Sequence, residues 1–228
     1  MRVAVLNDVH GNLPALEAVL AEVATLEVDR IVCGGDVVFG PFPRECLERL
    51  VDRGAVFVRG NADRVTGNDW PESSWVAERL DPLALEFLRE LPESIALDGV
   101  RFCHGSPRSD EEILTRVSPD ERVRAALAGV TERLVVGGHT HVQFEREVDG
   151  VRLVNAGSVG RPYEGRQGAF WALVDGLDVD LRRTPYAVEA AVAAIRASGY
   201  PEADDLCSTL LDPKDPDEVS AYFESIAS

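Results

Sequence analysis

Short apolar runs alternate with amphipathic segments at the start of the chain. Residues 3–6, 31–33 and 55–58 are runs of strand length, and helical apolar spacing fills the intervals between them. Asn12 is placed to cap the first helix, which has Pro14 in its first turn, and Gly54 to end the second, over 44–53. This order predicts a parallel sheet with right-handed crossovers.

The pattern changes after residue 63. A polar loop around 67–69 and a helix over 82–91 precede a region dominated by strand patterns, with Asp149-Gly150 predicting a hairpin between two of them. The predicted strands are 94–97, 100–103, 134–136, 143–148, 151–154, 169–174 and 177–181, and the predicted helices are 121–128, 186–197, 203–211 and 216–226. We expect an α/β protein with one domain over 1–228, a candidate cap segment at 64–92 and a C-terminal helical appendage at 186–228.

The composition indicates which partners and which cellular compartment are compatible with the chain. The chain has 228 residues, 45% of them hydrophobic, and a net charge of -17, which disfavours genomic DNA and anionic membranes as partners. No apolar stretch resembles a signal peptide or a membrane span. The four cysteines lack paired spacing, which favours a reduced, cytoplasmic protein. A small phosphorylated substrate stays compatible with the charge, because bound cations would dominate the local field. The sequence leaves the oligomeric state open.

Potential metal ligands follow five of the predicted strands, and all four histidines are among them. The set is Asp8, His10, Asp36, Asn61, His104, His139 and His141. Each motif alone has an ordinary explanation, because Asp and Asn favour turns and a lone histidine is more often structural. Ligands gather at the carboxyl ends of strands in open α/β sheets, so the joint occurrence predicts a metal centre.

The motifs resemble those of the calcineurin-like metallophosphoesterase superfamily, over residues 1 to about 175. They are Asp8-x-His10, Gly35-Asp36, Gly60-Asn61-x-Asp63, His104-Gly105 and Gly138-His139-Thr140-His141. The segments 40–46, 104–108 and 155–160 are further similar to its small bacterial and archaeal phosphodiesterase branch, often described as diadenosine-tetraphosphatase-like. The resemblance implies a four-layer sandwich, in which two mixed sheets pack face to face between helices.

The resemblance also implies a ligand set and an activity. Asp8, His10 and His141 would hold one divalent ion, Asn61, His104 and His139 a second, and Asp36 would bridge them. Two such ions acidify a shared water, and the resulting hydroxide attacks phosphorus. Asp36 and Asn61 are therefore the candidate catalytic residues of a phosphodiesterase acting on diesters or nucleotide anhydrides. Mn²⁺ is the expected metal, with Fe or Zn²⁺ as alternatives.

One position departs from the family pattern, and the substrate site is less defined. Most members carry a histidine at the position of Ala62, where it helps to protonate the leaving group. Its absence here disfavours the hydrolysis of monoesters with poor leaving groups. Arg108 and Arg161 are candidate phosphate-binding residues, although surface pairing with carboxylates explains them equally well. Trp70 and Trp75 are candidates for stacking a nucleobase of a nucleotide-like substrate, or for packing. A phosphomonoesterase, a protein phosphatase and a non-catalytic scaffold stay as alternatives, and retention of all seven ligands disfavours the scaffold.

Overall fold

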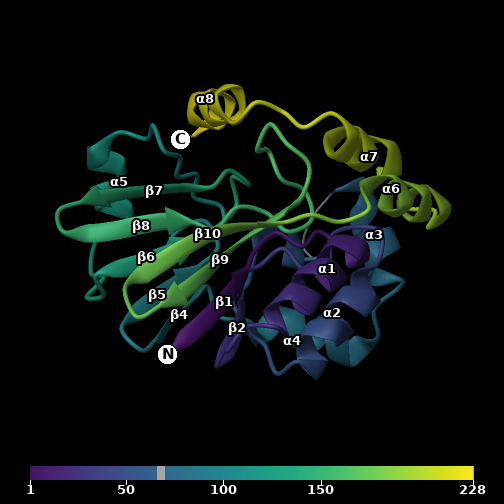
Figure 1. Ribbon diagram of the computed structural model, residues 1–228, viewed down its shortest axis with the longest axis horizontal. Coiled ribbons are helices and arrows are strands. Elements are labelled where there is room, and N and C mark those ends of the chain that lie inside the picture. Colours follow the sequence, from purple (N-terminus) through teal and green to yellow (C-terminus); the bar gives the residue numbers. More distant parts are fainter. Residues whose placement is uncertain (66–69, 228) are drawn as a thin grey trace.

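The computed structural model describes residues 1–65 and 70–227, which form two five-stranded mixed sheets (Figure 1). The first sheet has the order β10-β9-β1-β2-β3. Its strands are β1 (Arg2–Leu6), β2 (Arg30–Cys33), β3 (Val56–Phe57), β9 (Ala169–Asp175) and β10 (Asp178–Thr184). Strands β1, β2 and β3 pair in parallel, which confirms the predicted opening of the fold, while β9 and β10 add antiparallel strands.

The second sheet has the order β4-β5-β6-β8-β7. Its strands are β4 (Ser94–Leu97), β5 (Val100–Cys103), β6 (Leu134–Gly137), β7 (Phe144–Val148) and β8 (Val151–Asn155). Strands β5, β6 and β8 run in parallel, with an antiparallel strand at each edge. The hairpin between β7 and β8 turns at Asp149 and Gly150, whose φ angles of 52° and 82° suit a type I′ turn, as predicted.

The two sheets pack face to face across one apolar core. Val3 and Val5 of the first sheet share this core with Phe102 and Val136 of the second. Helices α1 (Leu13–Val23), α2 (Pro43–Asp52) and α4 (Pro82–Glu90) cover the outer face of the first sheet, and α5 (Asp120–Ala126) packs on the second (Figure 1). The four-layer sandwich expected from the sequence is therefore confirmed.

The C-terminal segment crosses both halves of the molecule (Figure 1). Helices α6 (Val188–Ala197) and α7 (Ala203–Leu211) pack against each other, and α8 (Pro216–Ile226) reaches α5 through the ion pair of Glu224 with Arg122. One short helix, α3 (Pro71–Ala77), was not predicted, and most of the polar loop around 67–69 lies outside the described residues. Within the described chain, every helix is too short or too polar to cross a bilayer.

Candidate metal centre

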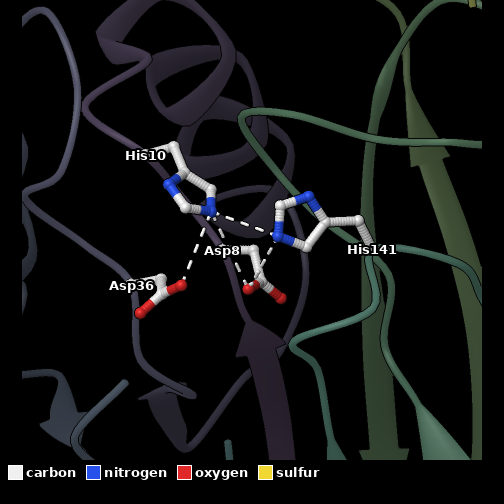
Figure 2. A group of neighbouring side chains, drawn as sticks. All are labelled: Asp8, His10, Asp36 and His141. Carbon is white, nitrogen blue, oxygen red and sulfur yellow. Dashed lines mark hydrogen bonds and ion pairs between the residues drawn. The ribbon is translucent and has the colours of Figure 1, made fainter. Parts of the chain in front are cut away.

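The predicted ligands meet where five strands end. The loops after β1 and β2 carry Asp8, His10 and Asp36, and those after β3, β5 and β6 carry the remaining four. Figure 2 shows Asp8, His10, Asp36 and His141 pointing toward one another. One ligand atom from each of these four lies within 4.8 Å of the others. Residues up to 133 positions apart in the chain, from Asp8 to His141, therefore form one cluster, as expected of strand ends.

The first group of ligands consists of Asp8, His10 and His141. The Nε2 atom of His141 lies 3.1 Å from Asp8 Oδ1 and 3.1 Å from His10 Nε2. The other oxygen of Asp8 accepts a hydrogen bond from the backbone N–H of His139 at 3.0 Å, which fixes the carboxylate. Asp8 Oδ1 is buried and accepts no hydrogen bond from any described residue, so it is available to a cation.

The second group consists of Asn61, His104 and His139. His104 Nε2 lies 3.1 Å from the Oδ1 atom of Asn61 and 3.2 Å from the Nδ1 atom of His139. Asp36 lies between the two groups, because its Oδ2 atom is 3.6 Å from His10 Nε2 and 3.4 Å from His104 Nε2. Its Oδ1 atom accepts a hydrogen bond from the backbone N–H of Ala62 at 2.8 Å. The two groups therefore share one carboxylate oxygen as their common neighbour.

Hydrogen bonds to backbone carbonyls place the imidazole nitrogens for metal binding. The Nδ1 atoms of His10, His104 and His141 lie 3.2, 2.9 and 2.7 Å from the carbonyl oxygens of Phe39, Gly34 and Arg161. A carbonyl only accepts, so each Nδ1 carries the proton and each Nε2 of a neutral ring presents a lone pair. Two such lone pairs, on His10 and His141, face each other at 3.1 Å, an arrangement that a cation between them stabilises. The donor set thus fits a divalent metal.

Left-handed backbone is concentrated at the ligands. Among the described residues other than glycine, seven have positive φ, and five of these are Asp8, His10, Asp36, His139 and His141. The other two, Asp98 and Asp149, precede glycines at turns. This conformation is costly for residues with a Cβ atom, and such strain is typical of functional sites.

Asp63 and Gly60 hold the loop that carries Asp36. The carboxylate of Asp63 accepts hydrogen bonds from the backbone N–H groups of Asp36 and Val37, both at 2.8 Å, and of Gly60 at 3.0 Å. A Cβ atom on Gly60 would lie 2.1 Å from Asp36 Oδ1, so this close approach requires glycine. Asp63 therefore caps the loop.

Burial and neighbouring charges set the protonation of the ligands. Burial, with repulsion from His141, lowers the pKa of His10 to about 4, and burial with the charge of His104 lowers that of His139 to about 4. Burial also disfavours charge on His104, yet Asp36 and Asp8 outweigh it and raise its pKa to about 10. In the metal-free protein, the proton on His104 therefore supplies positive charge beside the carboxylates.

A cavity of about 350 Å³ opens onto this cluster. We call the lining residues at the ligand cluster the floor, namely His10, Asp36, Asn61 and Ala62. The other described lining residues are called the outer wall, namely Phe39, Trp70, Glu72, Arg161, Tyr200, Glu202 and Asp205. Arg161 forms an ion pair with Asp205. Arg108 does not line the cavity; it forms an ion pair with Glu112 at 2.6 Å and donates to the carbonyl of Ala125 at 2.8 Å.

The two tryptophans occupy different positions. Trp70 lines the cavity and makes an edge contact with Phe39, with ring centroids 5.0 Å apart. Trp75 packs against Tyr200 and lies under the guanidinium of Arg79, 3.5 Å from its ring centroid. Glu72 reaches the cavity from α3, within the segment 64–92 predicted as a cap. Tyr200 and Glu202 reach it from the connection between α6 and α7, and the sequence did not single them out.

The comparisons with known proteins agree with this geometry. A family model described as a calcineurin-like phosphoesterase superfamily domain matches residues 1–176. The chain belongs to this superfamily. It is 29% identical over 232 residues to an uncharacterized protein of Methanocaldococcus jannaschii, covering 88% of this chain and 94% of the relative. Members of the superfamily use divalent metal ions, in keeping with the ligand cluster.

Solved structures show the same architecture. A metallophosphoesterase from Sphaerobacter thermophilus is 28% identical with a TM-score of 0.80, covering 93% of this chain and all of that one (100%). A hypothetical protein from Pyrococcus horikoshii is 24% identical with a TM-score of 0.79, covering 94% of this chain and 99% of its own, and shows the fold alone. The resemblance inferred from the motifs, to small bacterial and archaeal members, is thus confirmed.

Proposed function

We propose that this superfamily member is a two-metal phosphodiesterase that hydrolyses phosphodiester or nucleotide anhydride bonds, with Mn²⁺ as its metal. The observation that carries the proposal is the position of Asp36 Oδ2, at 3.6 and 3.4 Å from imidazole nitrogens of two separate ligand groups. Asp8, His10 and His141 would hold one ion, Asn61, His104 and His139 would hold the other, and Asp36 would be shared by both. When bound, two such ions polarise phosphate oxygens and acidify an attacking water.

The chain's own residues have separate tasks in this proposal. Asn61 binds through its carbonyl oxygen, which leaves its amide N–H groups to donate to a phosphate oxygen. Arg161 lines the same cavity and binds the phosphate with the part of its guanidinium that Asp205 leaves free. We assign no such role to Arg108, because it does not line this cavity. Residues 1–228 act as one domain, in which segments 64–92 and 186–228 both contribute to the outer wall.

Two features favour a diester over a monoester as the substrate. Ala62, with 3% of its surface exposed, occupies the floor, so this position supplies no acid for a basic leaving group. Three carboxylates, from Glu72, Glu202 and Asp205, line the outer wall and repel the second charge of a monoester dianion. A monoesterase or protein phosphatase is therefore the second candidate.

The test pairs metal analysis with two chromogenic substrates. Protein saturated with Mn²⁺ and freed of excess metal is expected to contain two ions per chain by elemental analysis. It is expected to hydrolyse bis(p-nitrophenyl) phosphate at least about tenfold faster than p-nitrophenyl phosphate, and chelation should abolish both activities. One ion per chain would contradict the two-metal proposal. Faster monoester turnover would favour the second candidate, and no turnover of either ester by loaded protein would favour a scaffold.

A further inference from the structure

The outer wall has an excess of negative charge beside a site proposed to bind an anion. Among the described residues that line the cavity, Arg161 is the one arginine or lysine, and it forms an ion pair with Asp205. Glu72 and Glu202 make no ion pair within 4.0 Å with any residue that the structure describes. Two carboxylates therefore face the cavity without positive partners, whereas a site for a polyanionic substrate would be expected to carry additional Lys or Arg.

Tyr200 is an independent sign that this wall binds a ligand. Only 7% of its surface is exposed, it lines the cavity, and its hydroxyl makes no hydrogen bond with a described residue. Burial raises the pKa of Tyr200 above its usual value, and the nearby charges of Glu72 and Glu202 raise it further. The hydroxyl therefore stays neutral beside the two carboxylates. The residue is buried, but its hydroxyl oxygen is not among the fully buried side-chain atoms, so the hydroxyl can pair with a ligand in the cavity.

Aromatic rings complete this wall. Phe39 and Trp70 form an edge-to-face pair with centroids 5.0 Å apart, and Tyr200 is fixed by an edge contact of 5.2 Å with Trp75. Aromatic rings combined with carboxylates are the usual protein environment for ammonium groups, quaternary ones included. Phosphate, by contrast, is bound by guanidinium groups, backbone N–H groups and metals, and the candidate metal ligands His10, Asp36 and Asn61 lie at the floor.

We infer that the outer wall binds an ammonium group on one arm of the substrate, so that the protein selects phosphodiesters of amino alcohols. This inference rests on the proposed phosphodiesterase function and narrows it. The phosphate lies on the floor near Arg161, and the ammonium lies between the aromatic rings and the carboxylates of Glu72 and Glu202. Dinucleoside polyphosphates are poor substrates in this scheme, because the carboxylates of Glu72 and Glu202 repel their additional phosphates.

The test compares two diesters of one shape that differ in charge. p-Nitrophenyl phosphorylcholine carries a trimethylammonium group, and p-nitrophenyl 3,3-dimethylbutyl phosphate carries a tert-butyl group in its place. We expect Mn²⁺-loaded protein to prefer the choline ester by about tenfold in kcat/KM, the scale of a desolvated cation–π contact. The double change Glu72→Gln and Glu202→Gln should bring this ratio close to one. The matched control is Glu78→Gln, which changes an exposed carboxylate at the end of α3 outside this cavity and should preserve the ratio.

The outcomes separate this inference from the proposed function. A ratio of one, in protein that hydrolyses bis(p-nitrophenyl) phosphate, overturns the inference and leaves the phosphodiesterase proposal intact. A stronger preference for p-nitrophenyl thymidine phosphate overturns it in favour of a nucleobase site. If no diester is hydrolysed, the proposed function fails, and calorimetry with phosphorylcholine and 3,3-dimethylbutyl phosphate still tests the wall. Equal affinities for these two ligands would then overturn the inference.

Discussion

The floor and the outer wall of the cavity differ in how the chain builds them. Asp36 on the floor follows a buried strand, accepts the backbone N–H of Ala62 and lies against Gly60. Tyr200 and Glu202 on the wall come from the connection between two C-terminal helices that lie beyond the matched family region of 1–176. The candidate metal ligands therefore lie within the matched family region, while Tyr200 and Glu202 come from a segment outside it.

Local strain distinguishes the two regions as well. Three floor and cluster residues, Asp8, His10 and Asp36, have φ between 45° and 55°, whereas the wall residues lack positive φ. Strained conformations persist only where surrounding structure overdetermines them. The floor should therefore tolerate few substitutions without loss of metal or fold, and the wall should tolerate many with a change in selectivity. Four predictions test this contrast.

The largest effect is expected from Asp36→Asn on the floor. The amide oxygen can still accept the N–H of Ala62, but the charge shared by both ligand groups is lost. Because even supporting residues around metals are worth 10- to 100-fold, we expect kcat/KM for bis(p-nitrophenyl) phosphate to fall more than about 100-fold. The control is Asp204→Asn, whose side chain is 91% exposed on α7. A variant with near-normal turnover would contradict the bridging role.

A change beneath the floor should lower stability. The carboxylate of Asp63 accepts backbone N–H bonds at both Oδ1 and Oδ2, and Asp63→Asn replaces one of these oxygens by an amide N–H₂ that cannot accept them. Leaving a buried donor unsatisfied costs about 1–3 kcal/mol, so we expect the free energy of unfolding to fall by roughly 2–3 kcal/mol. Thermal unfolding of the metal-free protein should show a Tm about 5–10 °C lower. A Tm within one or two degrees of the parent would refute the capping role.

Metal affinity should rise with pH. In the metal-free protein, Asp36 and Asp8 raise the pKa of His104 to about 10 against the opposing effect of burial, so this ring is protonated at neutral pH. Ligation through Nε2 displaces that proton, and one released proton gives about tenfold tighter binding per pH unit below pH 10. Calorimetry of Mn²⁺ binding in buffers of different ionisation enthalpy counts the protons. Binding that is independent of pH from 6 to 9 would contradict the assignment.

The sequence predicted the floor well and the wall poorly, for physical reasons. Asp8, Asp36 and His104 each follow an apolar run, and parallel strands bring such ends together without further information. Helix α3 has only seven residues, Pro71–Ala77, with two serines in its middle, so it offers little apolar periodicity. Pro71 in the first turn, followed by an acidic residue, was its one usable signal.

Long-range placement explains the remaining difference. Nothing local distinguishes Tyr200 or Glu202 from other polar positions near the end of the chain, and their approach to the cavity depends on how α6 and α7 pack. The same holds for the two candidate arginines. Arg108 and Arg161 both stand next to ligand motifs in the sequence, yet only Arg161 lines the cavity.

The smallest effect is expected from a substitution of Arg161, with Arg108 as its control. Arg161→Lys keeps the charge but removes the planar fork, so we expect kcat/KM for a diester to fall about tenfold, mainly through KM, with metal content unchanged. Arg108→Lys is the matched control, because its guanidinium contacts Glu112 and Ala125 outside the cavity. It should leave both constants within about twofold of the parent. Equal losses in the two variants would mean that the phosphate is not bound by Arg161, and the wall would then contribute no positive group to the site.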